Sequence, residues 1–238
     1  MRNKKNFVNE TYTVKEVTFK MVAVKAGTFT MGTDDTSVYD RYSSPAHQVR
    51  LTNDYWIGET EVTQELWQAV MESNPSCFLG KNLPVEQVSW DDIQQFITEL
   101  NQLTGKTFRL PTEAEWEFAA RGGNQSQGYK YSGSNNIDEV ARYFGNSRTS
   151  QPVKTKAANE LGLYDMSGNV WEWVNDWYGD YSSDPQTNPQ GPTTGSFRVI
   201  RSGGWSSALS ICRVANRNGL CANGYNCDIG FRLACSSN

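Results

Sequence analysis

The cysteines are the residues with the most obvious capacity for chemistry. The chain has five, Cys77, Cys212, Cys221, Cys227 and Cys235, and four of them lie in the last 27 residues. No CxxC pair occurs, so the spacing supports neither a zinc knuckle nor a thioredoxin-like motif. The cluster is compatible with a disulfide framework, with a reactive pair, or with no chemical role.

A single histidine, His47, narrows the possible sites further. One imidazole excludes a zinc or non-haem iron site built from several histidines. A Ser-His-Asp triad could use only His47, which lies in a short segment after Pro45. We interpret it as a surface or partly buried loop histidine.

Composition and charge exclude other classes. The 238 residues carry a net charge of -4, with a pI near 5.2 and a mean hydropathy of -0.62. This balance does not favour nucleic acid as a partner, because phosphate binding requires a basic field. The sequence contains no run of about 20 apolar residues, so we expect no membrane insertion. The basic start at Met1 is not followed by an apolar segment, so no signal peptide is visible.

Local signals predict three helices. Thr63 can cap a helix that ends before Asn74, and Ser89 with Asp92 forms a capping box for a helix that ends at Gly105. A second capping box, which starts at Thr112, leads into a helix that stops at 122–123.

Strand signals are shorter. They fall at 19–26, at 49–51 and 55–62 as a pair, and at 198–201 and 229–234. Beyond residue 122 helix signals nearly vanish. The order predicts an α+β fold rich in irregular loops, with 1–17 as an N-terminal extension (frayed or an edge strand) and 18–238 as a single domain.

Several long motifs occur in a fixed order along almost the whole chain. Together they resemble the sulfatase-modifying factor (formylglycine-generating enzyme) family, which implies a C-type-lectin-like fold. The motifs are Met31-Gly32, YWIGETEVT at 55–63, RLPTEAEWE at 109–117, GLYDMSGNVWEW at 162–173, SGGW at 202–205, RVANR at 213–217 and IGFRL at 229–233.

The resemblance implies two possible metal sites. Enzymes of this family oxidise a substrate cysteine with copper held by two thiolates that follow the Gly-Gly motif. Here only Cys212 lies between Gly204 and Arg213, so we expect no copper and no catalytic residues. The family's calcium site implies the ligands Asp165, Gly168, Val170 and Glu172, which are hard oxygen donors around a glycine turn. The alternative is that Asp165 caps a turn and Glu172 is buried against an arginine.

The C-terminal composition is unusual. Lys, Glu, Gln, Met and Trp make up 49 of the 238 residues, yet none occurs from Ser206 to Asn238, where that proportion would give about seven of 33. These five types are the ones that an Asn AAC codon cannot reach by changes at its two adenines. Fixed-looking blocks at 213–217 and 229–233 interrupt the segment. An ordinary bias of a loop-rich terminus toward small residues is the alternative explanation.

This pattern resembles the variable proteins of diversity-generating retroelements, whose adenine-directed variation lies on this type of fold. The resemblance implies a candidate variable region, 205–228, that forms a solvent-facing binding surface. Ser, Gly, Asn and Tyr, which are common there, are the residues of adaptable binding surfaces. The candidate variable positions are Ser206, Ser207, Leu209, Ile211, Asn218, Gly219, Leu220, Cys221, Gly224, Tyr225, Cys227 and Asp228, with Leu209, Ile211, Leu220 and Tyr225 as apolar anchors.

We therefore expect a non-enzymatic, calcium-stabilised protein that binds a protein or glycan on another cell or a phage host. Its setting would be surface-exposed, extracellular or virion-associated. Two alternatives remain: a copper-dependent formylglycine-generating oxidase that uses Cys212 with another thiol, and an undiversified lectin-like accessory domain.

Overall fold

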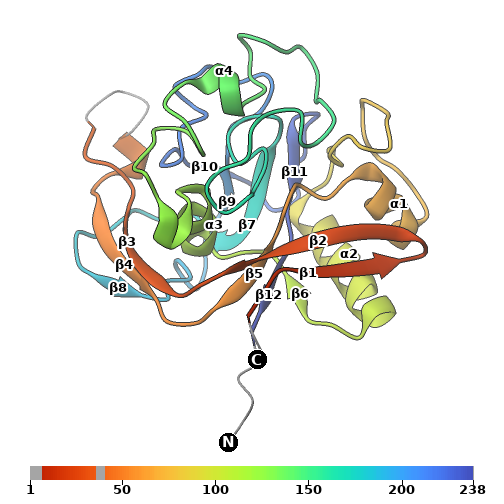
Figure 1. The fold of residues 1–238 in the computed structure, drawn as a ribbon, viewed down its shortest axis with the longest axis horizontal. Helices are drawn as coiled ribbons and strands as arrows, with labels where there is room; N and C mark the ends of the chain where they lie inside the picture. Colours follow the sequence, from red (N-terminus) through yellow and green to blue (C-terminus); the bar gives the residue numbers. More distant parts are fainter. Residues whose placement is uncertain (1–6, 36–40, 238) are drawn as a thin grey trace, which may run out of the picture.

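The computed structural model describes residues 7–35 and 41–237. Residues 1–6, 36–40 and 238, which include the start of the expected N-terminal extension, lie outside the described residues. Short strands, few helices and long irregular segments make up an α+β fold, as the sequence predicted. Figure 1 shows the strands crossing the middle of the molecule, with α1 and α2 at one end of β1 and β2.

A five-stranded sheet has the order β1-β2-β5-β12-β6 and is antiparallel throughout. Its edge strand β1 belongs to the segment expected to be an extension, in agreement with the edge-strand alternative. The C-terminal strand β12 lies between β5 and β6, so the two ends of the chain close one sheet. The strands are β1 (Glu10–Val14), β2 (Val17–Val24), β5 (Tyr55–Gly58), β6 (Phe108–Arg109) and β12 (Ala234–Ser236).

Two smaller sheets complete the strand structure of the described residues. The four-stranded sheet β10-β9-β7-β11 consists of β7 (Trp171–Trp177), β9 (Arg198–Arg201), β10 (Asn218–Leu220) and β11 (Ile229–Phe231). The three-stranded sheet β3-β4-β8 consists of β3 (Gly27–Met31), β4 (His47–Leu51) and β8 (Gln186–Thr187). The first of these sheets carries both ends of the candidate variable region.

The three expected helices are present with the expected caps. The Thr63 side chain accepts from Leu66 N–H at the start of α1 (Gln64–Met71). Capping boxes at Ser89 and Thr112 open α2 (Trp90–Thr104) and α3 (Glu113–Ala120). The short α4 (Ile137–Val140) and the 3₁₀ turns η1 (Arg41–Ser43) and η2 (Gly123–Gln125) were not predicted.

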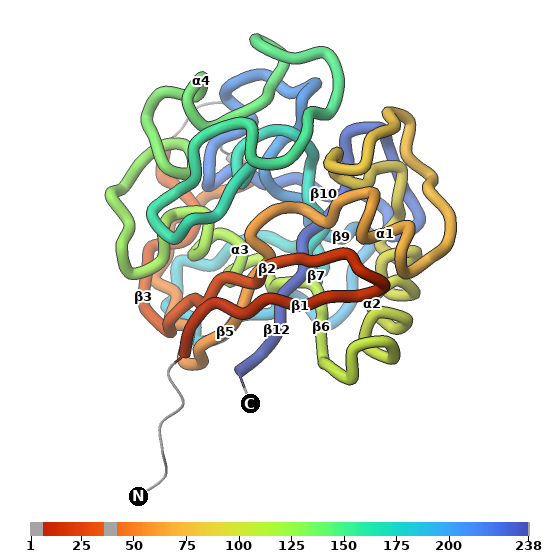
Figure 2. Tube along the Cα trace, turned by 45° about the vertical axis from the view of Figure 1, so that its right-hand side comes forward, coloured from red at the N-terminus to blue at the C-terminus, as the bar shows by residue number. Residues whose placement is uncertain are grey.

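Two hydrophobic clusters hold the sheets and helices together. One packs α1 and α2 against the five-stranded sheet and β11, with Trp67, Phe96 and Phe231 at its centre. The other surrounds α3 and β3 to β5, with Trp116 and Tyr55 fully buried. The irregular segments around α4 and in the C-terminal part gather at the end of the molecule away from β1, β5 and β12 (Figure 2).

Two expectations about strands were wrong. Segments 49–51 and 55–62 do not pair with each other, because β4 pairs with β3 and β8 while β5 pairs with β2 and β12. The expected strand at 229–234 is divided between β11, which pairs with β7, and β12, which pairs with β5 and β6. Among the described residues, no helix is both long enough and apolar enough to span a bilayer.

Candidate binding face

Exposure along the C-terminal segment alternates between buried blocks and open loops. Residues 212–217 and 229–235 are buried without exception. They contain the two fixed-looking blocks 213–217 and 229–233, which we call the framework blocks. Ten of the twelve candidate variable residues are exposed or half-buried. We call these ten the C-terminal face: Ser206, Leu209, Ile211, Asn218, Gly219, Leu220, Cys221, Gly224, Tyr225 and Cys227.

Ser207 and Asp228 depart from the expectation, because they are only 9% and 7% exposed. The Ser207 hydroxyl accepts from Gly204 N–H at 3.0 Å, and Asp228 accepts from the Ser206 hydroxyl. Ser207 thus holds the loop backbone, and Asp228 holds the Ser206 side chain. The expectation that they face solvent was therefore wrong.

The apolar anchors divide into two kinds. Leu209 and Tyr225 are 49% and 62% exposed, so their side chains are open to a partner. Ile211 and Leu220 are half-buried and pack against the core that contains Phe231. They support the loops as much as they present a surface.

Both glycines of the face have little room for a side chain. A Cβ at Gly219 would lie 3.0 Å from the Tyr178 ring, and one at Gly224 would lie 2.8 Å from the Leu220 side chain. A substitution at either position therefore requires a neighbouring side chain to move.

Trp205 joins the two loops that carry most of the face. Its backbone N–H donates to Asn169 O at 2.7 Å, and its indole N–H donates to Cys227 O at 3.2 Å. Its ring packs edge-to-face on Phe78 with centroids 5.6 Å apart. Trp205 thus links segments 206–211 and 221–228 at the edge of the face.

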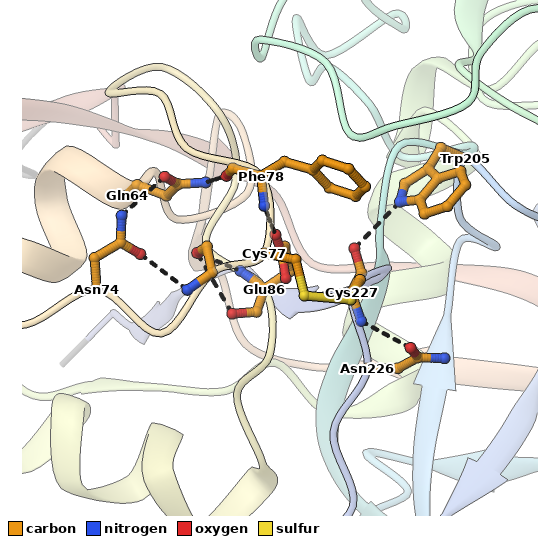
Figure 3. The surroundings of a disulfide bond; sticks show 9 residues. Gln64, Asn74, Cys77, Phe78, Glu86, Trp205, Asn226 and Cys227 are labelled. Carbon is orange, nitrogen blue, oxygen red and sulfur yellow. Dashed lines mark hydrogen bonds between the residues drawn. A yellow bond between two sulfur atoms is a disulfide. The ribbon is translucent and has the colours of Figure 1, made fainter.

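The loop at 221–227 lies on the segment that leads into α2. Gln87 N–H donates to Asn226 O at 3.1 Å, and Trp90 N–H donates to Ala222 O at 2.9 Å. A disulfide joins Cys227 to Cys77, 150 residues earlier (Figure 3). Cys227 is therefore fixed to the loop between α1 and α2, while Cys221 is free and exposed.

A buried arginine immediately precedes strand β10. The Arg217 guanidinium donates to Glu113 at 2.7 and 2.8 Å. Its central carbon also lies 4.3 and 4.1 Å from the ring centroids of Tyr178 and Tyr181. It also donates to Gly179 O at 2.7 Å. This fixes the backbone at the point where the exposed residues of β10 begin.

Two further buried arginines flank the loops. Arg201 donates to Glu117 at 2.6 Å and to Glu113 at 3.0 Å, which ties β9 to α3. Arg232 donates to both carboxylate oxygens of Glu172 at 2.6 and 2.7 Å, which ties the end of β11 to β7. The acidic partners Glu113, Glu117 and Glu172 are all buried.

The expected calcium ligands lie in a buried region. Glu172 is fully engaged by Arg232 and by the Trp116 indole N–H at 2.7 Å, which is the alternative considered from the sequence. Asp165 has φ 59° and accepts from Lys154 N–H at 2.8 Å. The Gly168 carbonyl accepts from the Ser202 hydroxyl at 3.1 Å, and Val170 is buried.

Negative charge nevertheless exceeds positive charge there. Glu61 is also buried, and its Oε2 has no hydrogen-bond partner. Burial, together with nearby carboxylates, raises the pKa of Asp165 to about 6 and that of Glu61 well above its usual range. Three buried carboxylates, those of Glu61, Asp165 and Glu172, thus lie near the buried Arg232 and the half-buried Arg142, and this excess of carboxylates suits a cation. Within residues 7–35 and 41–237, however, these three side chains do not converge as three ligands of one ion would.

Cys212 and His47 are both packed inside the protein. The Cys212 thiol lies in a small apolar cluster with Tyr131 and Ile137, where burial raises its pKa to about 12. His47 is 4% exposed, its Nδ1 lies 3.1 Å from Pro45 O, and its ring contacts Tyr181. Neither side chain is presented at the surface.

Sequence reasoning missed the acidic residues that hold the arginines. Glu113 and Glu117 lie within the capping-box motif at 109–117, where the motif explains only the roles of Thr112 and Glu115. Glu86, which lies beside the disulfide, carried no signal at all. An excess of acidic residues on a short helix was the only available indication of buried partners.

The fold is that of the formylglycine-generating-enzyme type, with a C-type-lectin-like core. The chain matches the model of the sulfatase-modifying factor enzyme 1-like domain over residues 8–237, and it belongs to that family. The matched region begins upstream of β1, so the first strand is part of the family domain.

The relatives that the chain matches include proteins with different names and roles. Treponema denticola variable protein 1 superposes with a TM-score of 0.89 at 35% identity, covering 97% of this chain and 99% of that one. The Mus musculus formylglycine-generating enzyme is 30% identical over 90% of this chain and 74% of its own length. The PvdO structure from Pseudomonas aeruginosa has a TM-score of 0.81 at 26% identity, covering 98% of this chain and 100% of that one. The similarity therefore includes both a variable protein and an enzyme.

Proposed function

We propose that this protein is a non-enzymatic ligand-binding protein whose C-terminal face is diversified by a diversity-generating retroelement. The observation that carries the proposal is the match between two independent patterns. Ten of the twelve candidate variable residues are exposed or half-buried, in loops and on the edge strand β10, while the interrupting blocks are buried. Exposed loop positions tolerate substitution with little loss of stability.

Similarity to a variable protein over nearly the full length of both chains supports the same proposal. The ligand is a protein or a glycan on another cell or a phage host, and the protein acts at an exterior surface. Leu209 and Tyr225 provide exposed apolar contact area, and Ser206 and Asn218 provide adaptable hydrogen bonds.

The environment of Cys212 argues against the copper-dependent oxidase. A soft metal such as copper(I) binds thiolates. A thiol with a pKa of about 12 in an apolar cluster is not ionised near neutral pH. Cys227 is bonded to Cys77, which leaves Cys221 and Cys235 as the other free thiols of the described chain.

We further propose a structural calcium ion held by Asp165 and Glu172 with the carbonyls of Gly168 and Val170. The surplus of buried carboxylate over guanidinium charge supports it, and the ion pair of Glu172 with Arg232 opposes it. The ion would stabilise the turn that leads into β7 and would take no part in ligand contact.

The sequence of the gene and its surroundings tests the diversification. We expect codons that end in C at the ten positions of the C-terminal face, and a nearby second copy of the segment with adenines at those codons. A reverse transcriptase gene should lie beside it. The framework codons of Val214, Ala215, Phe231 and Leu233 serve as the control, since both copies should agree there. The proposal would be refuted if the third codon positions of these ten residues followed the codon usage of the rest of the gene and no second copy of the segment were present.

A further inference from the structure

The disulfide between Cys77 and Cys227 has a third potential ligand beside it. One carboxylate oxygen of Glu86 and the two sulfur atoms all lie within 4.8 Å of one another. This is the one such group of three or more Cys, His, Asp or Glu side chains found within residues 7–35 and 41–237. The ligand atoms of a tetrahedral zinc ion lie about 3 to 4 Å apart, which is within this spread.

Only one of the two carboxylate oxygens of Glu86 has a hydrogen-bond partner. The residue is 0% exposed, its Oε1 accepts from Phe78 N–H at 2.9 Å, and its Oε2 has no hydrogen-bond partner. Burial raises the pKa of this carboxyl group. A buried carboxylate oxygen without a partner is unfavourable, and a cation beside it would remove that cost.

The loop that carries Cys77 is held by contacts that do not involve sulfur. Gln64 donates to Phe78 O at 2.7 Å and accepts from Asn74 at 2.9 Å, while Asn74 accepts from Ser76 N–H at 3.2 Å (Figure 3). Because Gln64 is 1% exposed, these bonds are sheltered from water.

Cys227 is held in the same way on its own side. Its N–H donates to the Asn226 side chain, and its carbonyl accepts from the Trp205 indole at 3.2 Å. We therefore expect the two thiols and Glu86 to stay close together when the sulfur–sulfur bond is reduced.

We propose that the reduced form of the Cys77/Cys227 pair, together with Glu86, binds a thiophilic divalent cation such as Zn²⁺. A dithiol reductant supplies two electrons and two protons to the disulfide and leaves as its own disulfide. The two thiols then release two protons to bind the cation. Two thiolates and one carboxylate form a ligand set that suits Zn²⁺, with a water molecule as the fourth ligand. Cys77 is exposed, so the cation can enter from solvent.

This site is independent of the proposed ligand-binding function. Cys227 is one of the candidate variable positions, so the metal site belongs to this sequence and would be absent where another residue takes its place. The two cysteines either form a disulfide or, together with Glu86, bind a cation, and they cannot do both at once.

The experiment uses the full chain, the probe Cd²⁺ and a phosphine reductant. The reduced protein should bind one equivalent and show the ultraviolet band of sulfur-to-cadmium charge transfer, which Zn²⁺ should displace. The oxidised protein should show no such band. C227S should abolish the band, and E86Q should weaken binding at least tenfold. C221S, which removes an exposed free cysteine of the same loop, is the matched control and should bind as the wild type does.

Alkylation mapped by mass spectrometry provides a second measurement on the unmutated chain, so it does not depend on the variants folding. Cd²⁺ should slow the alkylation of Cys77 and Cys227 at least tenfold and leave that of Cys221 unchanged. Equal rates with and without Cd²⁺ at Cys77 and Cys227, or loss of the band in C221S but not in C227S, would overturn the proposal. Neither result bears on diversification, which rests on the gene sequence.

Discussion

Tyr225 belongs to the C-terminal face, whereas Phe231, six residues later, belongs to a buried framework block. We therefore predict that substitution has a small effect on stability at Tyr225 and a large one at Phe231. The Tyr225 side chain is 62% exposed, so Tyr225→Ala should change the free energy of unfolding by less than about 0.5 kcal/mol. Phe231 is 0% exposed and packs edge-to-face on Phe96 and Trp67, at 5.4 and 6.1 Å between ring centroids. Phe231→Ala leaves a cavity at this contact and should cost about 3 to 5 kcal/mol.

Urea unfolding followed by tryptophan fluorescence measures both changes, with equal slopes as the check on two-state behaviour. Leu209→Ala is the control for an exposed apolar residue on the other loop. Ser207→Ala should behave as a frame substitution and cost about 1 to 3 kcal/mol, because it leaves Gly204 N–H without its acceptor. A loss above about 1.5 kcal/mol in Tyr225→Ala would show that the loop is part of the core and would refute the division between the C-terminal face and the buried framework.

Four further predictions address the frame and the metal. Glu113→Ala should cost about 3 to 5 kcal/mol in urea unfolding, since it removes the carboxylate bound by the buried Arg217 guanidinium and leaves Arg201 with Glu117 alone; a loss below about 1 kcal/mol would contradict this. Burial and the charge of Glu113 raise the pKa of Asp176 to about 8. The folded form therefore holds a proton that the unfolded form releases near pH 4, so stability should fall between about pH 4 and 8, by at most about 1.4 kcal/mol per pH unit. The variant D176N should lack that slope. Chelation of calcium should lower the Tm of the wild type and leave the Tm of D165N unchanged. An equal change in Tm in both proteins would show that Asp165 is not a ligand. A disulfide-exchange reagent should titrate one thiol, Cys221, in the native oxidised protein and three in denaturant.

Features that depend on neighbouring residues in the chain could be predicted. The three helix starts follow from capping side chains that bond to N–H groups three residues away, and all three helices are present. The α+β class followed from the order of the helix and strand signals, and the family followed from the ordered motifs. These signals are local, so a single sequence is enough to detect them.

Strand partners could not be predicted, because pairing is decided by contacts distant in sequence. Strand β7 is buried on both faces and shows no alternation, so it carried no strand signal. The segment at 229–234 looks like one strand, yet Arg232 is used to bind Glu172 and the chain changes sheets there. The disulfide spans 150 residues, and five cysteines leave its partners undetermined.

Under the proposed diversification, the buried ion pairs would let the C-terminal segment vary without losing its anchors. Arg201, Arg217 and Arg232 flank the loops of the face, and arginine is a residue that codons ending in C can encode. Glu cannot be encoded in that way, and no Glu occurs after residue 172. All three arginines take their carboxylate partners from α3 and β7, upstream of the candidate variable region 205–228. If adenine-directed mutation acts within this region and spares the block 213–217 that contains Arg217, it leaves every acidic partner intact, and the loops remain held by the same buried ion pairs.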